Sequence, residues 1–242
     1  MRTPKPGLPR GFPQHDRVRA MARIRASILV VAGAVASASF AAPALRQAAL
    51  VVSVTGKPAG VARMSYVETG KVIELGEHDG IVLGYLKSCV QETITGGTVT
   101  VGSDQSEVQS GKVARTKVAC DPGTTDNDRE GAGGVVVRGT MPTGATPALT
   151  LYGTAPMIEL NGPATLQIER VGRPSERYSV SVTDEQLLNG RFYDFAKTGK
   201  NLTAGGLYTL KAGAEEIVFK IDPHARPGAT PILGRLLRFQ PG

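Results

Sequence analysis

The only two cysteines of the chain, Cys89 and Cys120, stand at the ends of a run of glycines and alternating apolar residues. Two such thiols could form a disulfide, bind a metal or carry out redox chemistry. Zinc would need two more ligands, and His78 and His224 are far apart with no metal-like spacing. A redox pair would favour a CxxC motif, which is absent. The pattern therefore predicts a structural disulfide, worth roughly 3 to 4 kcal/mol for a loop of about 30 residues.

One acidic stretch begins like a calcium-binding loop. Asp126, Asp128 and Glu130 place carboxylates at positions 1, 3 and 5, and glycine follows at position 6. The bidentate glutamate expected at position 12 is replaced by Val137. We therefore favour a solvated linker here, with a weak calcium loop at these three carboxylates as the alternative. No other metal and no cofactor is predicted.

Catalytic motifs are absent from the sequence. It contains no GxSxG elbow, no HExxH and no SxxK with its partner boxes. A Ser/His/Asp catalytic triad remains an alternative, because its members need not be neighbours in sequence. His78, for example, has Asp79 beside it. An exposed loop is nevertheless the favoured place for both histidines. We predict no catalytic residue; the alternative is a periplasmic hydrolase whose site is assembled on the C-terminal β region.

The net charge of +7 is concentrated at the N-terminus. Residues 1–42 carry seven basic residues and one acidic residue, a net charge of +6 that leaves +1 for the remaining 200 residues. A nucleic-acid-binding protein would need a basic stripe with interleaved aromatics on its folded part. No such stripe is present, so we predict no nucleic-acid partner. The charged residues concerned are Arg2, Lys5, Arg10, Arg17, Arg19, Arg23, Arg25 and Asp16.

The N-terminal charge belongs to a pattern typical of a secretory signal peptide. A basic segment precedes an apolar stretch from Ile28 to about Val35, and small residues follow in Ala36-Ser37-Ala38 and in Ser39-Phe40-Ala41. Export to the periplasm would also place the two cysteines in an oxidising compartment. Met21 would then be an alternative start, with residues 1–20 as a disordered extension.

An uncleaved inner-membrane anchor is the alternative to a cleaved signal peptide. The widest apolar span, from Ile28 to Ala44, has 17 residues, most of them alanine and serine. Such a span is short and weakly apolar for a bilayer crossing. We therefore predict no stable membrane span after cleavage of the signal.

The rest of the chain predicts an all-β fold in two parts. Short apolar or alternating segments separated by glycines fill residues 48–121, as in Thr98-Val99-Thr100-Val101. Among them, separate strands are predicted at 71–75, 80–86, 91–95 and 97–102. Residues 122–147 are rich in Gly, Pro and Thr and are predicted to form a linker. Strand signals then recur every 8 to 15 residues or so over 148–242, the spacing of a small antiparallel sandwich.

Tyr208 and a group of aromatic residues stand out in the second part. Tyr208 follows a Gly-Gly turn and begins an alternating strand, as the tyrosine of an immunoglobulin-like tyrosine corner does. We predict a structural role for it. Phe192, Tyr193 and Phe195 lie in a segment that reads as a short helix or a long loop. A small core cluster is their favoured role, and an exposed aromatic patch for a sugar or a partner is the alternative.

The first β part resembles the FecR-type periplasmic domain over about residues 50–120. Its outline of glycine and aliphatic positions falls on Gly70-Lys71-Val72-Ile73-Glu74-Leu75, on the segment from Gly80 to Leu86 and on Gly97-Thr98-Val99. The resemblance implies a β-rich extracytoplasmic domain with a binding or signalling role. Regulators of that kind carry an anti-sigma segment and a transmembrane helix before this domain. At most 27 residues precede the apolar stretch here, without a helical pattern, so sigma-factor control is not predicted.

Together these features predict an exported, non-catalytic envelope protein. It would have a FecR-like β domain over residues 48–121 and an immunoglobulin-like β-sandwich over 148–242. Its expected partner is another envelope protein or cell-wall glycan. A weaker alternative is signal relay to a membrane sensor.

Overall fold

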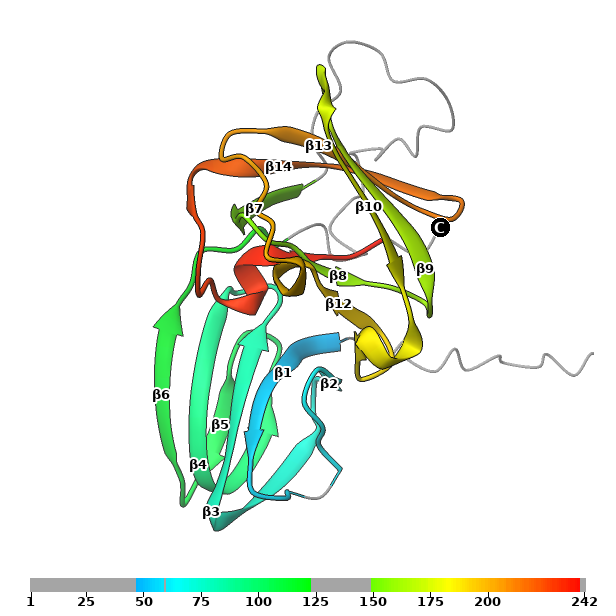
Figure 1. The fold of residues 1–242 in the computed structure, drawn as a ribbon. Helices are drawn as coiled ribbons and strands as arrows, with labels where there is room; N and C mark the ends of the chain where they lie inside the picture. The colour runs from blue at the N-terminus through cyan, green and yellow to red at the C-terminus, as the bar shows by residue number, and fades with distance from the viewer. Residues whose placement is uncertain (1–46, 59, 123–148, 240–242) are drawn as a thin grey trace, which may run out of the picture. The chain divides into compact units, whose positions relative to one another are not determined.

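The computed structural model describes residues 47–58, 60–122 and 149–239. Their regular structure consists of β-strands and short 3₁₀ helices (Figure 1), as the sequence predicted. The predicted signal peptide, most of the predicted linker and the candidate calcium loop at Asp126, Asp128 and Glu130 lie outside the described residues. Internal contacts group these described residues into one compact unit.

The first β region is one six-stranded sheet in the order β2-β1-β3-β4-β5, with β6 also paired to β4. Segments 71–75 and 80–86, predicted as separate strands, belong to the single strand β3, and segments 91–95 and 97–102 belong to β4. The strands are β1 (Gln47–Thr55), β2 (Tyr66–Glu68), β3 (Val72–Tyr85), β4 (Val90–Val101), β5 (Ser106–Gln109) and β6 (Lys112–Lys117).

Two glycines explain how the strand β4 pairs with both β5 and β6 along one of its sides. Gly96 and Gly97, with φ of 65° and 82°, separate the half of β4 that pairs with β6 from the half that pairs with β5. A Cβ on Gly97 would lie 2.3 Å from the carbonyl oxygen of Gln109, so a larger residue would clash with the backbone. The local backbone therefore demands glycine here.

A bulge in β3 lies opposite this point. The register between β3 and β4 shifts between Leu75 and Gly80. Asp79 holds the bulge, because its carboxylate accepts hydrogen bonds from the backbone N–H groups of Gly76, at 3.0 Å, and Lys57, at 3.2 Å. Both halves of the bent strands contribute to one aliphatic core, whose most buried members include Ala49, Val51, Ile73, Ile81, Leu83, Ile94, Val99 and Val101.

The second β region contains two sheets. The five-stranded sheet has the order β10-β9-β13-β14-β7, and the four-stranded sheet has the order β11-β12-β8-β15. Strands β9-β13-β14 follow the C-F-G order, and β8-β12-β11 the B-E-D order, of immunoglobulin-like sandwiches. The strands are β7 (Leu149–Gly153), β8 (Met157–Glu159), β9 (Ala164–Arg170), β10 (Arg173–Val182), β11 (Leu187–Leu188), β12 (Phe192–Asp194), β13 (Leu207–Ala212), β14 (Glu215–Arg226) and β15 (Leu236–Leu237).

Alternation along the strands builds the core of this sandwich. On β9, Leu166 and Ile168 are fully buried, whereas Thr165 and Gln167 are exposed. The buried positions of both sheets meet in one cluster, in which Ile158 and Tyr193 of the smaller sheet join Leu210 of the larger one. Segment 184–199 provides the 3₁₀ helices η1 (Asp184–Gln186) and η2 (Phe195–Thr198) with β11 and β12 between them.

A third apolar cluster contains residues of both β regions, which the sequence did not predict. Met64 and Leu86 come from the first region, whereas Met157 and Phe192 come from the second. The remaining members include three residues of or next to the 3₁₀ helix η3 (Ile232–Arg235). We call this group the shared cluster: Leu50, Met64, Leu86, Met157, Phe192, Ile232, Leu233 and Leu236.

Polar contacts accompany the shared cluster. The Tyr66 hydroxyl donates to the Glu159 carboxylate at 2.5 Å, and Arg191 also donates to Glu159, at 2.5 Å. The side-chain amide of Asn189 donates to the carbonyl oxygen of Met64 at 2.9 Å. Burial is the main cause that raises the pKa of Tyr66, and the neighbouring Glu159 charge adds to it. Tyr66 therefore keeps its proton and remains a donor.

Candidate binding surface

The two cysteines form the predicted disulfide. Their Cα atoms are 5.8 Å apart, and the described residues include no free cysteine. Cys89 is buried with a left-handed backbone φ of 53°, and the half-buried Cys120 packs against the shared cluster. The bridge thus ties the connection between β3 and β4 to the chain segment that leaves β6. Its position beside a cluster of both regions gives it a structural role.

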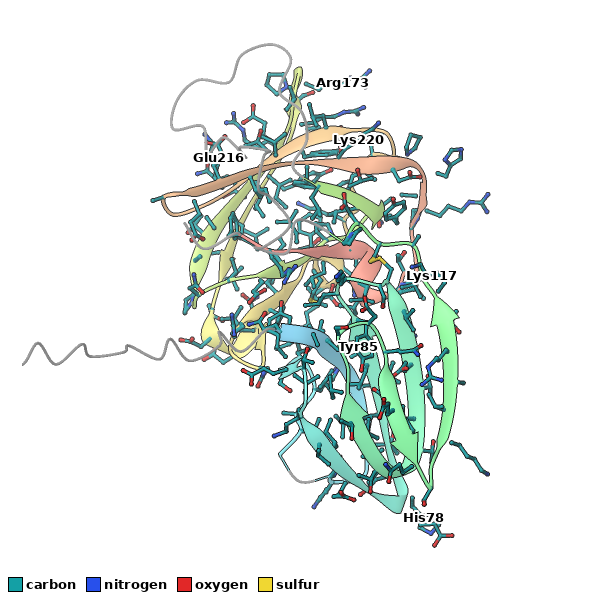
Figure 2. All side chains as sticks on the ribbon, turned by 180° about the vertical axis from the view of Figure 1, so that it is seen from behind. His78, Tyr85, Lys117, Arg173, Glu216 and Lys220 are labelled. Carbon is teal, nitrogen blue, oxygen red and sulfur yellow. A yellow bond between two sulfur atoms is a disulfide. The ribbon has the colours of Figure 1, made fainter. Side chains whose placement is uncertain are left out.

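The two histidines of the described residues lie in different β regions and are both exposed. His78 is exposed in the bulge of β3, where Figure 2 shows its side chain at an extremity of the molecule. His224 lies on β14 with its ring 95% exposed and its Nδ1 3.4 Å from Asp222 Oδ1. Neither histidine lines a hollow. Within 47–58, 60–122 and 149–239, no three His, Cys, Asp or Glu side chains gather as they would around a metal ion.

Tyr208 belongs to a polar cluster at the start of β13. Its hydroxyl accepts a hydrogen bond from the backbone N–H of Thr203 at 2.7 Å and donates one to Glu176. The Glu176 carboxylate also accepts from Arg170 at 2.9 Å and from the Thr203 hydroxyl at 3.0 Å. Burial of Tyr208, with its hydrogen bond to Glu176, raises the pKa of the phenol to about 12.

The Glu176 carboxylate remains ionised in this cluster. Burial by itself would raise the pKa of Glu176, but the hydrogen bonds from Tyr208, Arg170 and Thr203 outweigh it and lower the pKa. A neutral phenol and an ionised carboxylate hold each other in place, and neither titrates near neutral pH. The cluster therefore braces the loop before β13.

The aromatic segment is part of the core, as the favoured interpretation predicted. Phe192 and Phe195 are fully buried, and Tyr193 is 3% exposed. Phe192 belongs to the shared cluster, where the Tyr66 ring meets it edge-on at a centroid distance of 5.7 Å. Tyr193 and Phe195 lie in the sandwich core. The alternative of an exposed aromatic patch is wrong for these three residues.

A buried ionic group in the first region was missed by the sequence analysis. The side chain of Glu92 has no exposed surface, and its carboxylate accepts from Arg115 at 2.6 Å and from the backbone N–H of Ser106 at 3.1 Å. The Ser106 hydroxyl lies 2.6 Å from that of Tyr85. Burial is the main cause that raises the pKa of Tyr85 to about 12. The Glu92 carboxylate thus has its hydrogen-bond donors within the protein, and the group stabilises the sheet by linking β4, β5 and β6.

The outer face of the five-stranded sheet is polar and flat. Exposed residues of its central strands alternate with the buried ones, and ion pairs join neighbouring strands. Glu169 of β9 accepts from Arg177 of β10 at 2.5 Å, and Lys211 of β13 lies 3.4 Å from Glu216 of β14. Thr165, Gln167, Ser179, Ser181 and Lys211 are exposed along it.

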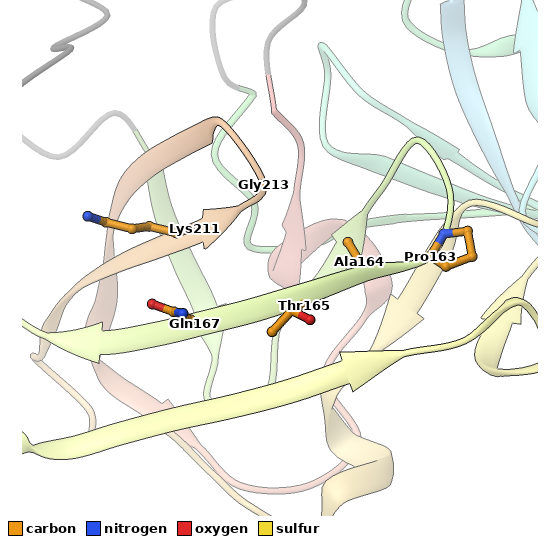
Figure 3. A pocket seen from close by; sticks show the side chains of 6 residues that line it. All are labelled: Pro163, Ala164, Thr165, Gln167, Lys211 and Gly213. Atoms are coloured by element: carbon orange, nitrogen blue, oxygen red, sulfur yellow. The ribbon is translucent and has the colours of Figure 1, made fainter.

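A shallow hollow of about 380 Å³ opens at one corner of this face. Figure 3 shows Thr165 and Gln167 on β9 and Lys211 on β13, beside the turn at Gly213. A hydroxyl, an amide and an ammonium group thus surround the hollow, with Pro163, Ala164 and Gly213 completing its lining. These groups can donate and accept hydrogen bonds. The hollow is suited to binding a polar group.

Comparison with known proteins returned no match among protein-family models, curated proteins or solved structures. In the described part of the chain no helix is long and apolar enough to cross a membrane.

Proposed function

We propose that the protein is an exported, non-catalytic binding module of the cell envelope that acts in the periplasm. The observation that carries this proposal is the outer face of the five-stranded sheet, where the hollow at Thr165, Gln167 and Lys211 offers a hydroxyl, an amide and an ammonium group for hydrogen bonding. The signal-peptide pattern and the disulfide support an oxidising, extracytoplasmic location. The resemblance of the first region to FecR-type domains supports a binding or signalling role.

The expected partner is an envelope protein or cell-wall glycan. Both present hydroxyl, amide and carboxylate groups, which Thr165, Gln167 and Lys211 could hydrogen-bond. Small residues at the rim, such as Ala164 and Gly213, let a ligand approach the strands closely. The face lacks an aromatic platform beside the hollow, so we expect hydrogen bonds rather than stacking to dominate the contact.

The test combines two binding assays on the same purified protein. One is co-sedimentation with purified cell-wall sacculi, and the other is pull-down from envelope extract. Lys211→Glu should reduce binding in whichever assay the unsubstituted protein is positive. Lys112→Glu is the matched control, because Lys112 is an exposed lysine of β6 in the other β region.

Equal loss from both lysine substitutions would show non-specific charge attraction and contradict the proposed surface. Absence of binding in both assays would contradict the proposed function itself. Turnover of a substrate by the purified protein would contradict the non-catalytic part of the proposal.

A further inference from the structure

Strand β10 ends the five-stranded sheet. Within the described part of the chain, β9 is the only strand that pairs with it. Figure 1 shows β10 beside β9 along most of its length. Successive residues of a strand direct their backbone N–H and C=O groups to opposite sides, so every second residue of β10 directs them away from β9. The regular part of this edge is Arg177–Val182, because Pro174 and a shift of register between Arg173 and Arg177 interrupt the pairing before it. A regular edge of this kind is a template for another strand.

The side chains of β10 also fit a further neighbour. Tyr178 and Val180 point toward the core but are only half-buried, whereas their partners on β9, Ile168 and Leu166, are fully buried. On the outer face Ser179 and Ser181 are small and exposed. An added strand would cover the apolar side chains without displacing any bulky residue from the outer face.

We propose that this edge binds a second copy of the chain, with the two β10 strands antiparallel about a twofold axis through Ser179. A twofold axis perpendicular to the joined sheet leaves the outer faces of both copies on the same side. Residues directly opposed across the two β10 strands must therefore point to the same face of the sheet. Ser179 then opposes itself, and Tyr178 opposes Val180 of the second copy. Aromatic and β-branched residues make favourable cross-strand pairs. The two five-stranded sheets become one continuous sheet.

The charges at the two ends of β10 favour this antiparallel arrangement. Arg173 and Arg177 lie at its start, and Asp184 and Glu185 follow directly after its end. Antiparallel pairing brings the basic start of one copy beside the acidic end of the other, which is favourable at both ends of the interface.

The neighbouring register is less favourable. An axis through Val180 would place Glu176 opposite Asp184 of the second copy, and like charges directly opposed destabilise a pair of strands. Ser179 is therefore the more favourable position for the axis.

The interface is small because it consists of one strand from each copy. We therefore expect a weak dimer, with a dissociation constant between about 10 μM and 1 mM. Sedimentation of the purified protein over this concentration range should show a monomer–dimer equilibrium. Ser179→Lys should shift it to monomer, because two ammonium groups would face each other at the axis. Thr165→Lys is the control, since Thr165 is exposed on the same face but lies on β9, away from the edge.

The register has its own test. The described cysteines are both held in the intramolecular disulfide, so an introduced cysteine would be the only free thiol among them. Under mild oxidation, Ser179→Cys should give a covalent dimer, because directly opposed residues have Cα atoms about 4.5 to 5.5 Å apart, within disulfide range. Ser181→Cys, which would oppose Arg177, should cross-link at least tenfold more slowly.

Three results would overturn the proposal. A protein that stays monomeric over the whole range, with no faster cross-linking of Ser179→Cys, would show that the edge does not self-associate. A dimer unaffected by Ser179→Lys would show that the copies meet elsewhere. Equal cross-linking of the two cysteine variants would contradict the axis at Ser179.

Discussion

The two β regions reach their stability by different means. The first encloses an aliphatic core with Tyr85 as its only aromatic member among the buried residues, and it adds the ion pair between buried Glu92 and exposed Arg115 and the disulfide. The second encloses a core between two sheets that includes Tyr193, Phe195, Tyr208 and Phe219. Large aromatic side chains bury more apolar surface each than aliphatic ones. Both regions contain ion pairs, so the difference lies elsewhere: the single bent sheet is joined by a disulfide, whereas the sandwich relies on aromatic packing.

The largest expected effect breaks the packing of the second region. Phe219 of β14 has no exposed surface and stacks on Tyr208 at a centroid distance of 5.7 Å. Phe219→Ala should lower the free energy of unfolding by about 4 kcal/mol through lost burial and a cavity. Urea unfolding measures this change. Val218→Ala, at the neighbouring half-buried position, is the control and should cost about 1 kcal/mol or less. Equal losses would contradict the role of aromatic packing.

The second prediction breaks the ionic brace of the first region. Glu92→Gln should destabilise the protein by about 2 kcal/mol, because the buried carboxylate loses its charge-assisted hydrogen bonds from Arg115 and from the backbone N–H of Ser106. The matched control is Glu169→Gln, whose partner Arg177 is 58% exposed, and its expected change is below about 1 kcal/mol. Urea unfolding of both variants measures the two changes in the free energy of unfolding. If Glu92→Gln were as mild as the control, the first region would not depend on its ion pair.

The third prediction concerns alkaline pH and sharpens the comparison, because each region contains a buried phenol whose pKa is raised to about 12. The pKa values of Tyr85 and Tyr208 are raised to about 12, above the ordinary value of 10.0. Only the unfolded chain therefore releases these protons between pH 10 and about 12, so stability is present below pH 10 and is lost as the pH rises through that window.

Each tyrosine should contribute a slope of up to about 1.4 kcal/mol per pH unit. Urea midpoints measured from pH 9 to 12 follow the loss. Tyr85→Phe and Tyr208→Phe should each make the pH dependence shallower. A stability that is constant up to pH 12 would show that these phenols are not shielded from water.

The smallest effect concerns the contact that the two regions share. Tyr66→Phe removes the hydrogen bond to Glu159, which keeps its bond to Arg191, so we expect a loss of about 1 kcal/mol. Hydrogen exchange should show faster opening in strands next to the shared cluster in both regions. Tyr152→Phe is the control, because Tyr152 is half-exposed and outside the shared cluster. Faster exchange confined to β2 would show that the two regions are not coupled there.

The sequence predicted those features that depend on local pattern. Recurring strand signals over 148–242 predicted a β-sandwich, and the Gly-Gly turn before Tyr208 indicated a structural tyrosine. The pairing of Cys89 with Cys120 followed from their number and from the expected compartment, not from local geometry. The strand boundaries within β3 were wrong, because glycine and charged residues in the bulge look like a turn between strands.

The remaining features depend on which strands become neighbours. Glu92 and Arg115 are distant in sequence, and they meet only because β6 pairs with β4 in one register. Tyr66 and Glu159 belong to different β regions, so no pattern within either region could connect them. The hollow beside Lys211 likewise depends on the turn at Gly213 lying next to the start of β9. No spacing in a single sequence encodes these long-range contacts.

The most direct test of the account is the intact mass of the protein recovered from the envelope fraction of the cells that produce it. An exported, disulfide-bonded module should have lost its N-terminal segment near Ala38 or Ala41, and its mass should be two hydrogens below that of the reduced chain. A mass that includes residue 1 or Met21, together with two free thiols, would contradict export and the structural disulfide at once.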